Sequence, residues 1–65
     1  MRVSVKLQGE ENAQALFDCM HGRKVRWREL GGGWHKLTFD HSSVDEAEAV
    51  VKDLYIGRYH IRAGE

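Results

Sequence analysis

Lys24-Val-Arg-Trp-Arg-Glu-Leu-Gly-Gly-Gly-Trp-His-Lys-Leu-Thr-Phe39 contains two runs of alternating polar and apolar residues, separated by three glycines. Alternation with a period of two is typical of a β-strand with one buried face. Because glycine readily adopts the positive φ angles of a tight turn, the pattern predicts a hairpin of strands at 24–30 and 34–39. A phosphate-binding glycine loop would instead be followed by a helix.

The same alternation predicts which side chains of the hairpin face the core. A slip of one residue in the second run would bury Trp34 but expose Leu37 and Phe39, so we expect Trp34 to face outward. The residues assigned to the core side are Val25, Trp27, His35, Leu37 and Phe39.

The residues before the hairpin predict one strand and one helix. Residues 2–8 alternate in the same way as the hairpin strands. In residues 10–20 apolar side chains recur at spacings of three and four, which indicates an amphipathic helix. Gly22 is expected to end this helix as its C′ residue.

The residues after the hairpin predict a second helix and a last strand. Ser43-Val-Asp-Glu46 fits the capping box, in which the serine hydroxyl and the glutamate carboxylate each accept a backbone N–H. The helix is expected to begin there and to end at Gly57. Residues 58–62 then alternate as a strand.

The predicted order of elements is strand, helix, strand, strand, helix, strand. This order matches an α+β, ferredoxin-like βαββαβ sandwich: a four-stranded antiparallel sheet of order 4-1-3-2 with two helices on one face. A chain of 65 residues is expected to form one such domain, residues 1–65. The other face of the sheet should be open to solvent.

The charges of the chain are predicted to be segregated, although ten basic and ten acidic residues cancel. Basic side chains, including Arg2 and Lys24, alternate away from the core on the strands, where Asp40 is the one clear acid. Acidic side chains fall mainly on the helices. The predicted partner-binding face consists of Lys6, Arg26, Arg28, Trp34, Lys36, Arg58 and Arg62. The alternative acidic face consists of Glu10, Glu11, Asp18, Asp45, Glu46, Glu48 and Asp53.

Each charged face has both a functional and an ordinary explanation. A positive sheet would attract phosphates or an acidic protein surface. An open antiparallel sheet also needs solvated side chains, and cationic strands discourage aggregation. The acids could bind a basic groove, but helices in small domains usually have charged outer faces, and acids stabilise helix N-termini.

The predicted topology resembles that of the RNA-recognition motif, a family that stacks bases on aromatic residues of its two central strands. Here the outward residues of those strands are Ser4, Lys6, Lys36 and Thr38, and Trp34 lies only at the margin. The resemblance therefore implies the topology without the stacking platform. Any contact with nucleic acid is expected to depend mainly on phosphates and strongly on salt.

The sequence does not indicate an enzyme, a cofactor or a metal site. Asp40-His41-Ser42 contains the residue types of a catalytic triad, but three consecutive residues do not usually align as one. Cys19 and His21 are two apart on a predicted helix, so they point to nearly opposite sides and lack further ligands. His35 is interpreted as a histidine at the edge of the core.

The single Cys19 cannot form an internal disulfide, and no segment is apolar enough to span a membrane. We therefore expect a soluble cytoplasmic protein, as a monomer or a homodimer. The leading hypothesis is a non-enzymatic protein that docks a charged face on a host protein or ribonucleoprotein complex, as small phage or mobile-element inhibitors of the anti-CRISPR type do. This hypothesis depends on small size and the lack of catalytic motifs. The alternatives are a nucleic-acid-binding module and a homo-oligomerisation domain.

Overall fold

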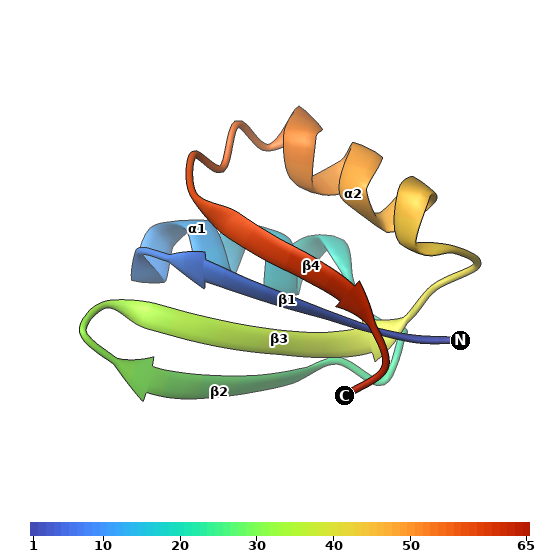
Figure 1. Cartoon of the computed structure of the whole chain (residues 1–65), viewed down its shortest axis with the longest axis horizontal. Coiled ribbons are helices and arrows are strands. Elements are labelled where there is room, and N and C mark those ends of the chain that lie inside the picture. The colour runs from blue at the N-terminus through green and yellow to red at the C-terminus, as the bar shows by residue number, and fades with distance from the viewer.

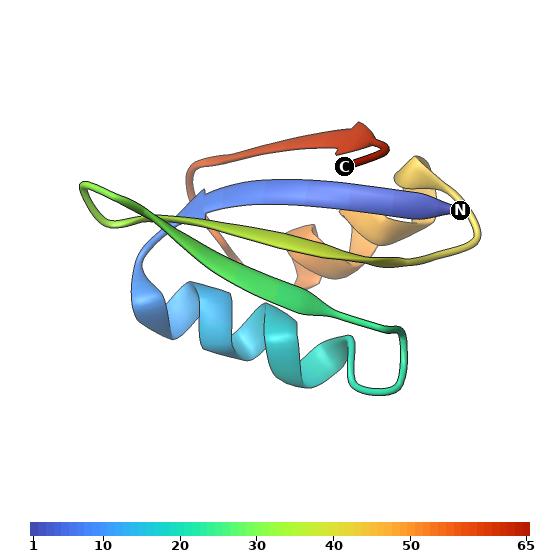
Figure 2. The same cartoon turned by 90° about the horizontal axis from the view of Figure 1, so that it is seen from below.

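The sheet has the strand order predicted from the sequence. The computed structural model describes all residues, Met1–Glu65. Its strands are antiparallel in the order β2-β3-β1-β4, which is 4-1-3-2 from the other edge. Both helices lie on one side of the sheet (Figures 1 and 2). The elements are β1 (Arg2–Gln8), α1 (Glu10–Cys19), β2 (Arg26–Gly31), β3 (Trp34–Asp40), α2 (Val44–Asp53) and β4 (Tyr59–Ala63).

The core lies between the sheet and the two helices. The side chains predicted to face inward from β3 are buried, and those of Val25 and Trp27 are half-buried against the core. His35 is 6 % exposed, and its Nδ1 accepts a hydrogen bond of 3.1 Å from Nε1 of Trp27. This confirms its position at the edge of the core. The buried apolar residues are Val3, Val5, Leu7, Ala13, Leu16, Met20, Leu37, Phe39, Ala47, Val51 and Ile56.

The hairpin turn is confirmed, but several strand boundaries differ from the prediction by one or two residues. The φ angles of Gly31, Gly32 and Gly33 are 92°, 64° and 83°, a region that favours glycine. The second strand begins at Arg26 because Lys24 has a φ of 53°, which is incompatible with an extended strand. The last strand begins one residue after Arg58.

The helices also end earlier than the glycines suggested. The first ends at Cys19, and Gly22, with a φ of 86°, lies in the turn that follows. The second ends at Asp53, and it is Tyr55 that takes the left-handed conformation, with a φ of 56°. Gly57 is therefore not the residue that reverses the chain after this helix.

The capping box is half formed at the start of α2. Ser43 Oγ accepts a hydrogen bond of 3.1 Å from the backbone N–H of Glu46. The Glu46 carboxylate, however, accepts a hydrogen bond from the hydroxyl of Ser42 rather than from the Ser43 backbone. The N-terminal cap therefore depends mainly on the Ser43 hydroxyl.

Replacing Ser43 by alanine is expected to lower the free energy of unfolding by about 1 kcal/mol, because one N–H at the start of α2 loses its acceptor. Urea unfolding followed by circular dichroism measures the change. Ser42→Ala is the matched control, since Ser42 does not cap the backbone, and we expect a smaller loss. Equal losses in the two variants would contradict the assignment of Ser43 as the cap.

Candidate functional site

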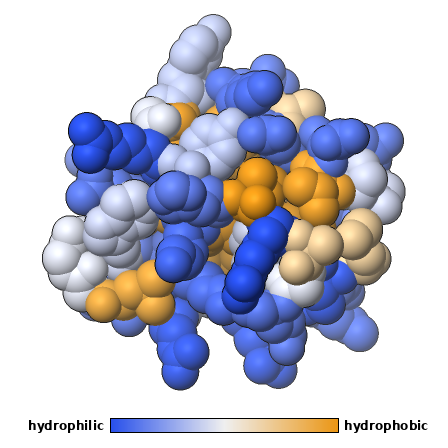
Figure 3. Space-filling view, in the orientation of Figure 1, coloured by the Kyte–Doolittle hydropathy of each residue, from blue (hydrophilic) through white to orange (hydrophobic).

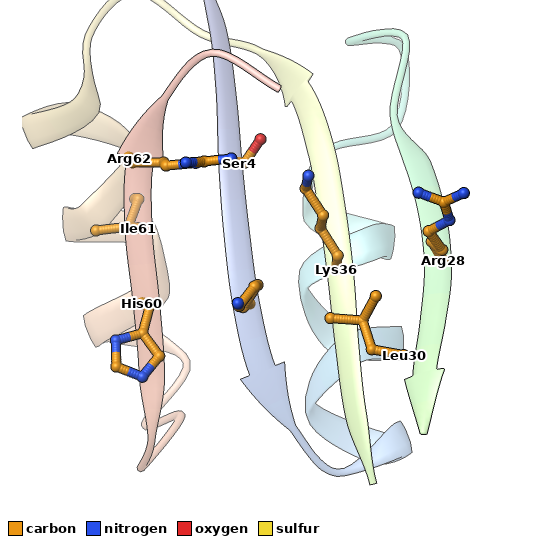
Figure 4. A pocket seen from close by; sticks show the side chains of 8 residues that line it. Ser4, Arg28, Leu30, Lys36, His60, Ile61 and Arg62 are labelled. Atoms are coloured by element: carbon orange, nitrogen blue, oxygen red, sulfur yellow. The ribbon is translucent and has the colours of Figure 1, made fainter. Parts of the chain in front are cut away.

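Three cationic side chains lie directly opposite one another on the open face of the sheet. Lys36 on β3 is opposite Arg28 on β2 and opposite Lys6 on β1, and His60 on β4 continues the row. Figure 4 labels Arg28 on β2, Lys36 on β3 and His60 on β4. Like charges at directly opposite positions destabilise a sheet. We call Arg28, Lys36 and Lys6 the central basic row.

The central basic row lines a shallow groove of about 470 Å³. Figure 3, which faces the open side of the sheet, shows a largely hydrophilic surface around a small apolar area. A second hollow of about 410 Å³ shares Arg28 and Lys36 with the groove and adds Arg26. The groove is lined by Ser4, Lys6, Arg28, Leu30, Lys36, His60, Ile61 and Arg62.

Arg2 binds the two acidic side chains that reach this face. Its Nη1 lies 3.0 Å from Asp40 Oδ1, and its Nε lies 3.4 Å from Glu65 Oε1. The hydrogen bond from Arg2 holds the pKa of the Asp40 carboxyl below 3.8. Because these carboxylates pair with Arg2, neither side chain neutralises the central basic row.

The Gly64–Glu65 segment covers one end of the face (Figure 1). The Ser4 hydroxyl donates to the Gly64 carbonyl, and Lys36 Nζ donates to the Glu65 carbonyl. Arg62 Nη2 donates to the same Glu65 oxygen at 3.3 Å. Ser4 is consequently only 3 % exposed, although its place in the strand puts it on the open face. The accessible part of the face therefore extends from the central basic row toward the glycine turn.

An aromatic pair lies at the glycine-turn end of the face. The rings of Trp34 and His60 are stacked, with centroids 5.9 Å apart and planes inclined by 29°. They line a hollow of about 300 Å³ together with Lys6, Leu30 and Gly31. Trp34 lies at the margin as predicted. The sequence analysis does not predict the pairing with His60. The predicted strand order puts β3 and β4 on either side of β1, but it does not give the register that brings these two rings together.

Most of the predicted basic residues converge. Lys6, Arg28, Lys36 and Arg62 line one groove, and Arg26 lines the adjacent hollow. Arg58 is exposed, precedes β4 and lines none of the three hollows, so the structure does not bring it into this site.

Several acidic residues of the alternative face have local structural roles. The Asp18 carboxylate accepts a hydrogen bond of 2.9 Å from Gln14 on the same helix. Glu48 accepts one of 2.8 Å from the Tyr59 hydroxyl, which raises the pKa of Tyr59 above 10.0. The acids in the first turns of the helices, where the helix dipole favours negative charge, are Glu10, Glu11, Asp45 and Glu46. These acids therefore have structural explanations that the central basic row lacks.

The Asp40-His41-Ser42 stretch is not arranged as a triad. The Ser42 hydroxyl lies 3.4 Å from His41 Nδ1 and donates to Glu46, but the Asp40 carboxylate that would orient His41 pairs with Arg2 instead. No three His, Cys, Asp or Glu side chains are grouped to hold a metal ion. None of the helices has the length and apolar character that crossing a bilayer requires.

No protein-family model, curated protein or solved structure matches this chain. The function proposed for the basic face therefore depends on its residues alone.

Proposed function

We propose that this is a non-enzymatic binding protein that docks the open basic face of its sheet on an anionic surface of a macromolecule. The observation that supports the proposal is the central basic row, in which Lys36 has a like charge directly opposite it on both neighbouring strands. This arrangement opposes folding, and an anionic ligand bound across the row would relieve the repulsion.

A face needed only for solubility would not require this arrangement. A glutamate at position 36 would keep the surface solvated and would pair favourably with Arg28 and Lys6. The sequence has a third cation there instead. Neither Arg28 nor Lys6 makes a side-chain hydrogen bond or ion pair within the protein, so both are available to a ligand.

The proposal requires a partner with a negatively charged surface, which a protein, a ribonucleoprotein complex or a nucleic acid can each present. Inhibition of such a complex, in the manner of anti-CRISPR proteins, stays a prediction based on the size of the chain. The shallow groove along the central basic row suits such inhibition, because a groove of this kind can bind a macromolecule without performing chemistry on it.

The protein is expected to bind flexible polyanions with an affinity that falls as salt rises. If Lys6, Arg28, Lys36 and Arg62 all engage a single-stranded polyanion, the affinity should fall about 50-fold between 50 and 200 mM NaCl. Fluorescence anisotropy with labelled polyglutamate and a labelled oligonucleotide measures the affinity at each salt concentration. Labelled polylysine is the control. The proposal fails if neither polyanion binds at 50 mM NaCl.

A further inference from the structure

The aromatic pair and the central basic row belong to one continuous surface. Lys6, Leu30 and His60 line both the main groove and the hollow beside Trp34. The surface thus combines a row of cations, a stacked aromatic pair and the apolar side chain of Leu30, which is 44 % exposed.

This combination distinguishes between classes of anionic macromolecule. An acidic protein surface would use the cations but has no particular need of an aromatic platform. A nucleic-acid duplex presents phosphates, but its base faces are stacked on one another inside the helix. A single strand presents phosphates together with free base faces, which stack on aromatic side chains with little dependence on sequence.

The position of the aromatic pair also fits a single nucleic-acid strand that runs across the β-strands of the sheet. The cations of the central row are on adjacent strands, about 4.8 Å apart from one strand to the next. The Trp34–His60 pair lies beside this row and spans β1, since its two members come from the strands on either side. Phosphates held on the row would leave their bases free to turn toward the rings.

We infer, building on the proposed function, that the basic face binds single-stranded nucleic acid, with phosphates on the central basic row and a base stacked on the Trp34–His60 pair. The Gly64–Glu65 segment covers Ser4 and meets this path at Lys36, whose Nζ donates to the Glu65 backbone oxygen. The site is expected to tolerate different sequences, because stacking and phosphate contacts identify no particular base.

The inference is tested with a labelled ten-nucleotide oligouridylate and an abasic oligonucleotide of the same length, at 50 mM NaCl. The wild-type protein should bind the oligouridylate more tightly than the abasic strand, by about 5- to 150-fold. Trp34→Ala should remove this difference while leaving the abasic strand bound with wild-type affinity. Trp34→Phe should retain most of the difference, because phenylalanine keeps an aromatic face.

The tryptophans provide a second measurement that does not depend on affinity. In a Trp27→Phe variant the remaining Trp34 fluorescence should be quenched by oligouridylate and not by the abasic strand. In a Trp34→Phe variant the remaining Trp27, which packs on Phe17 and His35 on the inner face of the sheet, should not be quenched. Circular dichroism confirms that each variant is folded before binding is measured.

The outcomes separate this inference from the proposed function. Equal affinity of the wild-type protein for the oligouridylate and the abasic strand would overturn the stacking of a base, while the docking proposal would stand. Tighter binding of a matched duplex or of polyglutamate than of oligouridylate would overturn single-stranded nucleic acid as the ligand. Failure to bind any polyanion would overturn both proposals.

Discussion

The double variant Lys6→Glu/Arg28→Glu is expected to bind polyanions on the order of 100-fold more weakly and yet to be more stable than the wild-type protein. Both new carboxylates would lie directly opposite Lys36, so two repulsive cross-strand pairs would become attractive. Such pairs contribute roughly 0.2–1 kcal/mol each. Anisotropy at 50 mM NaCl measures the binding, and urea unfolding measures the stability.

The opposite direction of the two effects makes this variant informative, because a gain in stability excludes unfolding as the cause of lost binding. The matched control is Lys52→Glu/Arg58→Glu, which changes the net charge equally at exposed positions outside the groove. The polyanion affinity of this control variant should stay within about 5-fold of that of the wild-type protein, since distant charges are screened by salt. Equal weakening in both double variants would show that net charge, and not the central basic row, determines binding.

Much of the fold could be predicted because the relevant signals are local. Period-two alternation identified the strands and their inward faces, and the glycines of residues 31–33 identified the hairpin turn. The errors lie at element ends, where single backbone angles matter. Nothing in the alternation indicates that Lys24 and Tyr55 adopt positive φ, so the predicted strand begins too early and the predicted helix end falls at Gly57.

The candidate site was predicted less completely, because it depends on contacts between distant strands. Alternation predicts that Lys6, Arg28 and Lys36 share a face, but only the register puts them directly opposite one another. The Trp34–His60 pair joins residues on strands that are not neighbours. The Gly64–Glu65 segment has no periodicity, so its position over Ser4 could not be anticipated.

Replacing Phe39 by alanine is expected to unfold much of the protein. Phe39 is the largest fully buried side chain and lies opposite Val3 in the central pair of strands. Truncation of a buried phenylalanine costs about 3–5 kcal/mol, whereas a domain of this length has about 3–10 kcal/mol in total. Urea unfolding followed by circular dichroism tests this, with Phe39→Leu as a milder variant that should lose less stability than Phe39→Ala, because leucine leaves a smaller cavity. Tyr55→Ala, at a side chain that is 93 % exposed, should change stability by no more than about 0.5 kcal/mol.

The same variant tests whether binding depends on the folded sheet. Phe39→Ala leaves all ten basic and ten acidic residues in place, but unfolding removes the register that aligns Lys6, Lys36 and Arg28. An unfolded chain with no net charge has no basic face, so polyanion affinity should fall in proportion to the unfolded fraction. Wild-type affinity in a variant shown to be unfolded would mean that the local basic sequence is sufficient, and would contradict docking by the assembled face. If the core positions the site, Phe39→Leu should bind polyanions more tightly than Phe39→Ala, to the extent that it is more stable.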